Sequence, residues 1–205
     1  MILVSFVIVL CFINAGTSAD PFFPDMSKIL ESSNISTNYS YSNHACDVCI
    51  CYKRKNPTGT YKLYVDCTYH DPPLTQFPIF PTDTSRLLLT GNAFEEIGYS
   101  NKFSQLPALR RIFLNNNKIS RISPTAFVNT SGVNMLLLHF NFITNVSTDV
   151  FKHMPKLKYL WLNDNNISSV QNNAFHNMSR IESIFLQNNN LSTLSDGQFV
   201  GNTFG

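Results

Sequence analysis

Apolar residues recur at a fixed interval through residues 84–205 of this 205-residue chain. Each unit has a short segment of alternating apolar residues that ends in an Asn. These residues are Asn92, Asn117, Asn141, Asn165 and Asn189. They are spaced 25 residues apart once and then 24 residues apart three times. Such a regular period is typical of a solenoid, because one unit cannot bury its apolar side alone and must stack on its neighbours.

Each unit predicts one short strand followed by a turn. The five units are 84–108, 109–132, 133–156, 157–180 and 181–204. Side chains alternate along a strand, so the residues that flank each strand centre, such as Leu136 and Leu138, are expected to point into the core. The recurring Asn turns the chain inward, and its side chain is expected to hydrogen-bond backbone groups of the turn.

The full pattern, Leu-x-x-Leu-x-Leu-x-x-Asn-x-Leu, resembles the leucine-rich-repeat family from Thr84 to the C-terminus. The resemblance implies an α/β fold, a short right-handed horseshoe with a parallel sheet on its concave side. We expect the convex side to consist of loops and short 3-10 turns, since units of about 24 residues leave little room for helices. The resemblance also implies protein recognition in adhesion, matrix organisation, guidance or innate immunity, as in slit-like proteins, small matrix proteoglycans and Toll-type ectodomains.

The N-terminus indicates export from the cell. Residues 1–13 are almost wholly apolar, and small residues follow as far as Ala19. The alternative is a membrane anchor, but an apolar run of about 12 residues is short of the roughly 20 that span a bilayer. We therefore predict a signal peptide over residues 1–19, a mature chain that starts at Asp20, a flexible arm over residues 20–45 and no membrane span.

Four cysteines remain after the signal peptide, namely Cys46, Cys49, Cys51 and Cys67. An even, clustered set in a secreted chain indicates two disulfides, and the spacing leaves three pairings open. The alternative is a zinc site, but structural zinc sites usually have two cysteine pairs and Cys67 stands alone.

Residues 46–83 resemble the cysteine-rich N-terminal cap of extracellular leucine-rich-repeat proteins. The matching residues are Cys46-x-x-Cys49-x-Cys51, Val65-Asp66-Cys67, Leu74 to Pro78, and Pro81. The resemblance implies the disulfides Cys46–Cys51 and Cys49–Cys67. A solenoid needs such a cover because its first strand would otherwise expose an apolar edge.

No cysteine-containing cap follows the fifth unit, so we expect an open apolar flank formed by Ile184, Leu186 and Leu191. The alternatives are a fragment of a larger receptor ectodomain, a flank covered by a partner or in a homodimer, and a marginally stable array.

The predicted concave side carries three columns of outward-pointing residues, one residue per strand. The central column is Leu88, Phe113, Leu137, Trp161 and Phe185. Beside it lie Arg86, Arg111, Met135, Tyr159 and Ser183 on one side, and Thr90, Asn115, His139, Asn163 and Gln187 on the other. Exposed aromatic residues beside arginine resemble the core and rim of an interface. We expect the ligand contacts to be Arg111, Phe113, Leu137, His139, Tyr159, Trp161 and Phe185.

Two considerations weaken this interpretation. Curvature of the sheet could bury the central column within itself. In addition, five strands about 4.8 Å apart span only about 20 Å, which gives a patch of about 300 Å². A standard interface buries about 800 Å² on each partner, so flanking loops or a dimer would have to contribute.

Seven Asn-x-Ser/Thr sequons predict N-glycosylation. They begin at Asn34, Asn38, Asn129, Asn145, Asn166, Asn177 and Asn190. We expect the sites in the arm and after the closing Phe to be accessible, and Asn166 and Asn190 to be more crowded.

The sequence gives little evidence for other classes of function. Charged residues make up 14% of the chain with a net charge of +2, which argues against nucleic-acid binding. The five histidines have no metal-site spacing, and no nucleophile elbow or phosphate loop occurs. We therefore predict a secreted binding protein, without enzyme activity, cofactor or metal, whose partner is an extracellular or cell-surface protein. The alternative is a structural matrix component that binds collagen or glycosaminoglycan.

Overall fold

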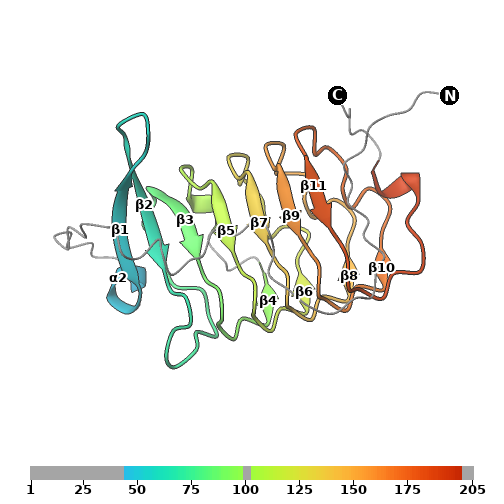
Figure 1. Ribbon diagram of the computed structural model, residues 1–205, viewed down its shortest axis with the longest axis horizontal. Coiled ribbons are helices and arrows are strands. Elements are labelled where there is room, and N and C mark those ends of the chain that lie inside the picture. Colours follow the sequence, from blue (N-terminus) through green and yellow to red (C-terminus); the bar gives the residue numbers. More distant parts are fainter. Residues whose placement is uncertain (1–43, 99–102, 200–205) are drawn as a thin grey trace.

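The computed structural model describes residues 44–98 and 103–199 (Figure 1). The predicted signal peptide, most of the predicted arm, and the sequons at Asn34 and Asn38 lie outside these residues. The first element is a short helix, α2 (His44–Val48), which begins two residues before the predicted start of the cap at Cys46.

A seven-stranded sheet forms one side of the molecule, in the order β1-β2-β3-β5-β7-β9-β11. The cap supplies the first two strands as an antiparallel hairpin, β1 (Ile50–Lys55) and β2 (Tyr61–Asp66). The repeats supply one strand each, all parallel. These are β3 (Thr84–Leu88), β5 (Arg111–Phe113), β7 (Met135–Leu137), β9 (Tyr159–Trp161) and β11 (Ser183–Phe185). The predicted parallel-strand solenoid is therefore confirmed.

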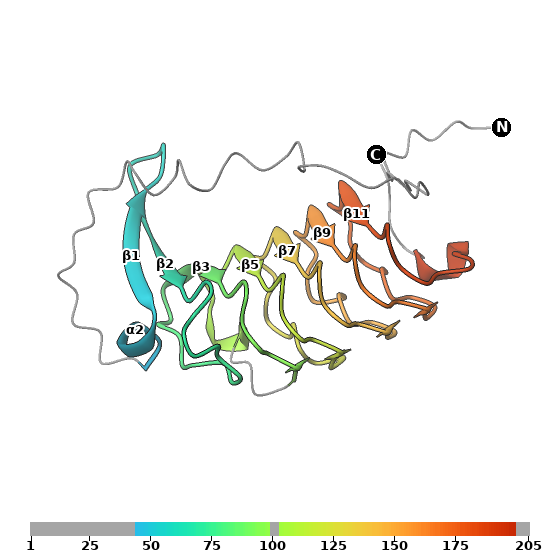
Figure 2. The ribbon, with the colours of Figure 1, turned by 60° about the horizontal axis from the view of Figure 1, so that its bottom comes forward.

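The opposite side is made of loops and very short elements, and the sheet curves away from it into a concave surface (Figure 2). Two 3-10 turns lie here, η2 (Phe103–Gln105) and η3 (Asp196–Gln198). The structure adds two parallel strand pairs that the sequence did not predict. They are β4 (Glu96–Ile97) with β6 (Arg121–Ile122), and β8 (Asn145–Val146) with β10 (Ser169–Val170).

The core is a stack of similar layers, one from each repeat. The residues that flank each strand centre are buried, as Leu136 and Leu138 illustrate. The Phe that closes each repeat contributes to a continuous spine of rings. Neighbouring ring centroids lie 6.4 Å apart from Phe103 to Phe127, 5.8 Å from Phe127 to Phe151 and 6.1 Å from Phe151 to Phe175. These are separations at which aromatic pairs attract each other.

Two disulfides hold the cap together. They join Cys46 to Cys51 and Cys49 to Cys67, the pairs that the family resemblance implies. Cys67 is buried, and its amide donates to the carbonyl of Leu88 in the first repeat. The cap therefore continues the hydrogen bonding of the sheet and covers the edge of β3.

The recurring Asn residues form a ladder of buried hydrogen bonds. Asn141 is representative: its Nδ2 donates to the carbonyls of Leu138 in its own repeat and of Leu114 in the preceding one. Its Oδ1 accepts the amide of Ile119. The same pattern holds at Asn92, Asn117, Asn165 and Asn189, and at Asn92 it reaches the Cys67 carbonyl in the cap.

We expect Asn141→Ala to lower the free energy of unfolding by about 1–3 kcal/mol, because buried backbone groups in two repeats would lose their partner. Urea denaturation of the variant and the wild type measures this difference. Thr144→Ala in the same repeat is the control, since its side chain is exposed and carries no predicted glycan. Equal midpoints for the two variants would show that the ladder contributes nothing to stability.

Candidate functional site

Strand register arranges the concave side chains in two rows that run across the sheet. The first row is Tyr52, Tyr64, Arg86, Arg111, Met135, Tyr159 and Ser183. The second row is Asp66, Leu88, Phe113, Leu137, Trp161 and Phe185. We call the surface formed by both rows the concave face. Side chains in these rows share one side of the sheet because directly paired residues point the same way.

The concave face is larger than the five strands of the sequence estimate. The cap hairpin adds β1 and β2, which contribute Tyr52 and Tyr64 to the first row. The rings of these two tyrosines meet edge to face, with centroids 5.4 Å apart. Sequence reasoning missed both residues because the hairpin lies outside the repeats. The alternation of Tyr52 and Arg54 with Cys51 and Lys53 was the available signal.

The second row is partly closed, as the curvature alternative anticipated. Leu137 is only 1% exposed and Trp161 only 7%. Leu137 lies outside the core cluster but has almost no surface to offer a ligand, because the larger Phe113 and Trp161 stand on the strands to either side. Trp161 stacks on Phe185 with ring centroids 4.9 Å apart, so it helps to hold the Phe185 ring in place.

Four of the expected contacts stay accessible. Arg111, Phe113, Tyr159 and Phe185 are all half-buried, and each lies on the sheet with one part of its side chain in solvent. Residues of this kind combine apolar contact area with a fixed position, which suits them to an interface.

Tyr159 is held by an acid from the next repeat. Its hydroxyl donates to Glu182, which also accepts a hydrogen bond from the ammonium group of Lys158. These bonds lower the pKa of Glu182 and raise the pKa of Tyr159 and of Lys158. All three groups therefore keep their neutral-pH charge states, and this end of the face presents an oriented phenol rather than a free charge.

His139 likewise has little exposed surface. It is 9% exposed, and its ring meets Phe140 edge to face with centroids 5.4 Å apart. The turn that follows β7 places Phe140 beside it, so the His139 ring supports the ring of Phe140.

Phe140 and Phe142 form an exposed apolar rim that the sequence reasoning missed. They are 52% and 54% exposed. Phe140 has a φ of 53°, a left-handed conformation that is costly for a bulky residue by about 1–3 kcal/mol. The equivalent position in the other repeats holds Gly or a small polar residue: Gly91, Asn116, Asp164 and Asn188. An aromatic residue that is both strained and exposed points to a binding role.

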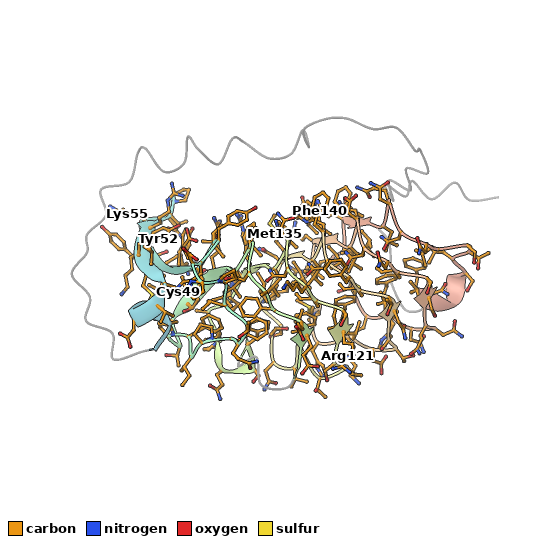
Figure 3. All side chains as sticks on the ribbon, turned by 90° about the horizontal axis from the view of Figure 1, so that it is seen from below. Cys49, Tyr52, Lys55, Arg121, Met135 and Phe140 are labelled. Atoms are coloured by element: carbon orange, nitrogen blue, oxygen red, sulfur yellow. A yellow bond between two sulfur atoms is a disulfide. The ribbon has the colours of Figure 1, made fainter. Side chains whose placement is uncertain are left out.

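This rim borders the concave face. Figure 3 shows Phe140 on the same side of the molecule as Tyr52 and Met135, whereas Arg121 of β6 lies on the opposite side. The sequence signal was the interruption of a column of Gly, Asn and Asp by one Phe.

The five sequons within the described residues lie away from both rows. Asn129, Asn145, Asn166, Asn177 and Asn190 are all exposed. Asn166 and Asn190 were expected to be crowded, but the turn after the ladder Asn directs both into solvent. None of these Asn residues belongs to either row, but Asn166 and Asn190 stand at the repeat position of Phe142, so glycans there would lie beside the rim.

Among residues 44–98 and 103–199, no group of His, Cys, Asp or Glu side chains is arranged to hold a metal ion. No helix within these ranges has the length and apolarity to cross a membrane. The two disulfides fit an extracellular location.

Comparison with known families identifies the repeats. A family model described as leucine rich repeat matches residues 84–141, 131–191 and 160–203, which together make up more than half of the chain. This chain belongs to the leucine-rich repeat family. The repeat strands of this leucine-rich repeat protein are therefore those that supply β3, β5, β7, β9 and β11 to the concave face.

Solved structures show the same fold. Two structures of the Toll–Spatzle complex from Drosophila, one of them the glycosylated form, match with a TM-score of 0.51 and 21% sequence identity. The match covers 53% of this chain and 14% of the Toll-complex chain. This leucine-rich repeat protein therefore corresponds to a small part of the length of those chains.

Proposed function

We propose that this chain is a secreted, non-catalytic protein-binding module that contacts an extracellular or cell-surface protein through its concave face and the flanking Phe140–Phe142 rim. The processes in which family members of this kind take part are adhesion, matrix organisation, guidance and immune recognition. The contact residues are Arg111, Phe113, Tyr159 and Phe185, with Trp161 as their support.

The main support for this proposal is the contrast between the two sides of the molecule. The concave face gathers half-exposed aromatic and arginine side chains on a rigid sheet, and no sequon of the described residues lies in either of its two rows. Aromatic residues and arginine are the types enriched at the energetic centres of protein interfaces. The cap strands and the rim also enlarge the available area, which supports binding without a dimer.

The structural neighbours are consistent with this role. The matched structures hold Toll in a complex with Spatzle. A binding function of that general kind, with a partner not defined by the likeness, is what we propose for this chain.

A glycan placed on the concave face is expected to block the partner. Ser183→Asn together with Phe185→Thr completes an Asn-x-Thr sequon on β11, in the first row. A bulky glycan there would exclude a protein surface. We expect at least roughly tenfold weaker binding, since displacing even one good contact costs more than 1.4 kcal/mol. Purified extracellular domains are screened with the wild type, and each binder is measured by biolayer interferometry.

Two controls accompany this variant. Thr193→Asn completes a sequon with Ser195 on the opposite side, one repeat after Ser169 of β10, and should leave binding unchanged. Phe185→Thr alone separates the loss of the ring from the effect of the glycan. A mass shift confirms that each new site is occupied. If the β11 variant, once glycosylated, binds as tightly as the wild type, the concave face is not the binding surface.

A further inference from the structure

Arginine side chains gather at the cap end of the concave face. Arg86 of β3 and Arg111 of β5 are direct neighbours in the first row, and Arg54 of β1 lies across from Lys62 of β2. Paired residues on adjacent strands are about 5 Å apart, so this positive patch extends over four strands. We call Arg54, Lys62, Arg86 and Arg111 the basic patch.

Aromatic rings fix the position of Arg86. Its guanidinium carbon lies 4.5 Å from the centroid of the Tyr64 ring and 5.7 Å from that of Phe113. Both are within the range of cation–π attraction. Its Nε is buried and has no hydrogen-bond partner among the described residues. A guanidinium held this way keeps its donors oriented at little entropic cost.

The basic patch has no acidic partners of its own. Within residues 44–98 and 103–199, none of the five ion pairs involves Arg54, Lys62, Arg86 or Arg111. Asp66 is the carboxylate of the second row, and its Oδ1 accepts the amide of Thr68. Four cations therefore share this end of the face with one carboxylate.

The uncompensated charge has an electrostatic cost. Burial lowers the pKa of Arg86, and the charges of Arg111 and Arg54 lower it further, while Tyr64 and Tyr52 oppose the shift. Arginine nevertheless stays protonated at neutral pH. Like charges that are held together without a counter-charge are stabilised when an anion binds between them.

We propose that the basic patch binds an acidic segment of the protein partner, with a side-chain carboxylate held between Arg86 and Arg111. This inference rests on the proposed function, because it assigns the chemistry of one part of the concave face. Arginine pairs carboxylates with two parallel hydrogen bonds, and clusters of arginine are a recurring means of recognising acidic motifs.

The shape of the patch favours a peptide over a sulfated polysaccharide. The first row continues from Arg111 to Met135 and then Tyr159, so the positive charge stops at β5. A sulfated chain following the row would leave its remaining charges over apolar side chains. A protein segment can instead place acidic residues at β3 and β5 and apolar residues at Met135 and beyond.

The test uses the full glycosylated chain and a fluorescein-labelled hexaglutamate peptide, measured by fluorescence anisotropy at low salt. We expect salt-sensitive binding to the wild type and no binding of hexaglutamine. Arg111→Gln should weaken hexaglutamate binding about tenfold, because a charge-assisted hydrogen bond is lost. Arg121→Gln is the matched control: it makes the same change of charge in β6 on the opposite side and should bind as the wild type does.

A second variant separates a loss of binding from a loss of the fold. Arg86→Lys keeps the charge but loses the paired donors, and we expect weaker binding with an unchanged circular dichroism spectrum. Equal losses in Arg111→Gln and Arg121→Gln, or equal binding of hexaglutamate and hexaglutamine, would overturn the proposal. So would a heparin hexasaccharide that binds more tightly than hexaglutamate and depends on Arg111. If the glycan on β11 blocks a protein partner while hexaglutamate does not bind, this proposal fails and the proposed function stands.

Discussion

Phe151→Ala is expected to lower the free energy of unfolding by about 3–5 kcal/mol, which makes it among the most damaging single changes in the array. Phe151 is fully buried between the rings of Phe127 and Phe175. Its removal leaves a cavity in the middle of the spine and breaks two ring contacts, each worth about 0.5–1.5 kcal/mol beyond burial. Urea and thermal denaturation measure the loss, and the melting temperature should fall by roughly 10 °C.

Phe142→Ala, in the same repeat, is the control for this change. Phe142 is exposed and packs into no part of the core cluster, so its removal should alter stability by less than about 0.5 kcal/mol. Comparable losses in the two variants would mean that the spine does not carry the stability of the solenoid.

The repeat architecture could be predicted because the pattern of apolar residues and Asn is local and recurs in five units. Each ladder Asn sits at a fixed distance from the apolar residues that it helps to bury, so the period is visible without knowledge of contacts. Asn141 shows why the pattern is strict: its side chain satisfies backbone groups in its own repeat and in the one before. An apolar residue at that position would leave these backbone groups without partners.

The cap strands could not be predicted from the repeats in the same way. β1 and β2 pair antiparallel and then join β3, an arrangement set by long-range hydrogen bonds and the Cys49–Cys67 disulfide. No periodic signal links Tyr64 to Arg86, although the two are paired. The basic patch therefore depends on the position of the hairpin beside the first repeat, which the sequence pattern does not show.

The exposed fraction of each side chain on the concave face could not be predicted from the sequence either. The direction of a side chain follows from strand alternation, which predicted that Leu137 points away from the core. Whether it reaches solvent depends on how closely neighbouring strands approach on the curved side and on the size of their side chains. The rings of Phe113 and Trp161 decide that outcome on β5 and β9, and they leave Leu137 inaccessible.

The cap and the binding face are connected physically. Tyr52 and Tyr64, which belong to the cap, line the basic patch, and Tyr64 supports the guanidinium of Arg86. A cap that opens would remove both the cover of the first repeat and one wall of the patch. The disulfides therefore contribute to stability and to the shape of the proposed site.

Replacing Cys49 and Cys67 together with Ala is expected to lower the free energy of unfolding by about 3 kcal/mol, since this disulfide closes a loop of 18 residues in the unfolded chain. Replacing Cys46 and Cys51 together with Ala, which opens a loop of 5 residues, should cost closer to 2 kcal/mol. The difference should be enlarged by the burial of Cys67 in the core. Urea denaturation without reductant compares the two double variants with the wild type. A larger loss from the Cys46–Cys51 pair would show that local order at α2, rather than closure across β2, holds the cap in place.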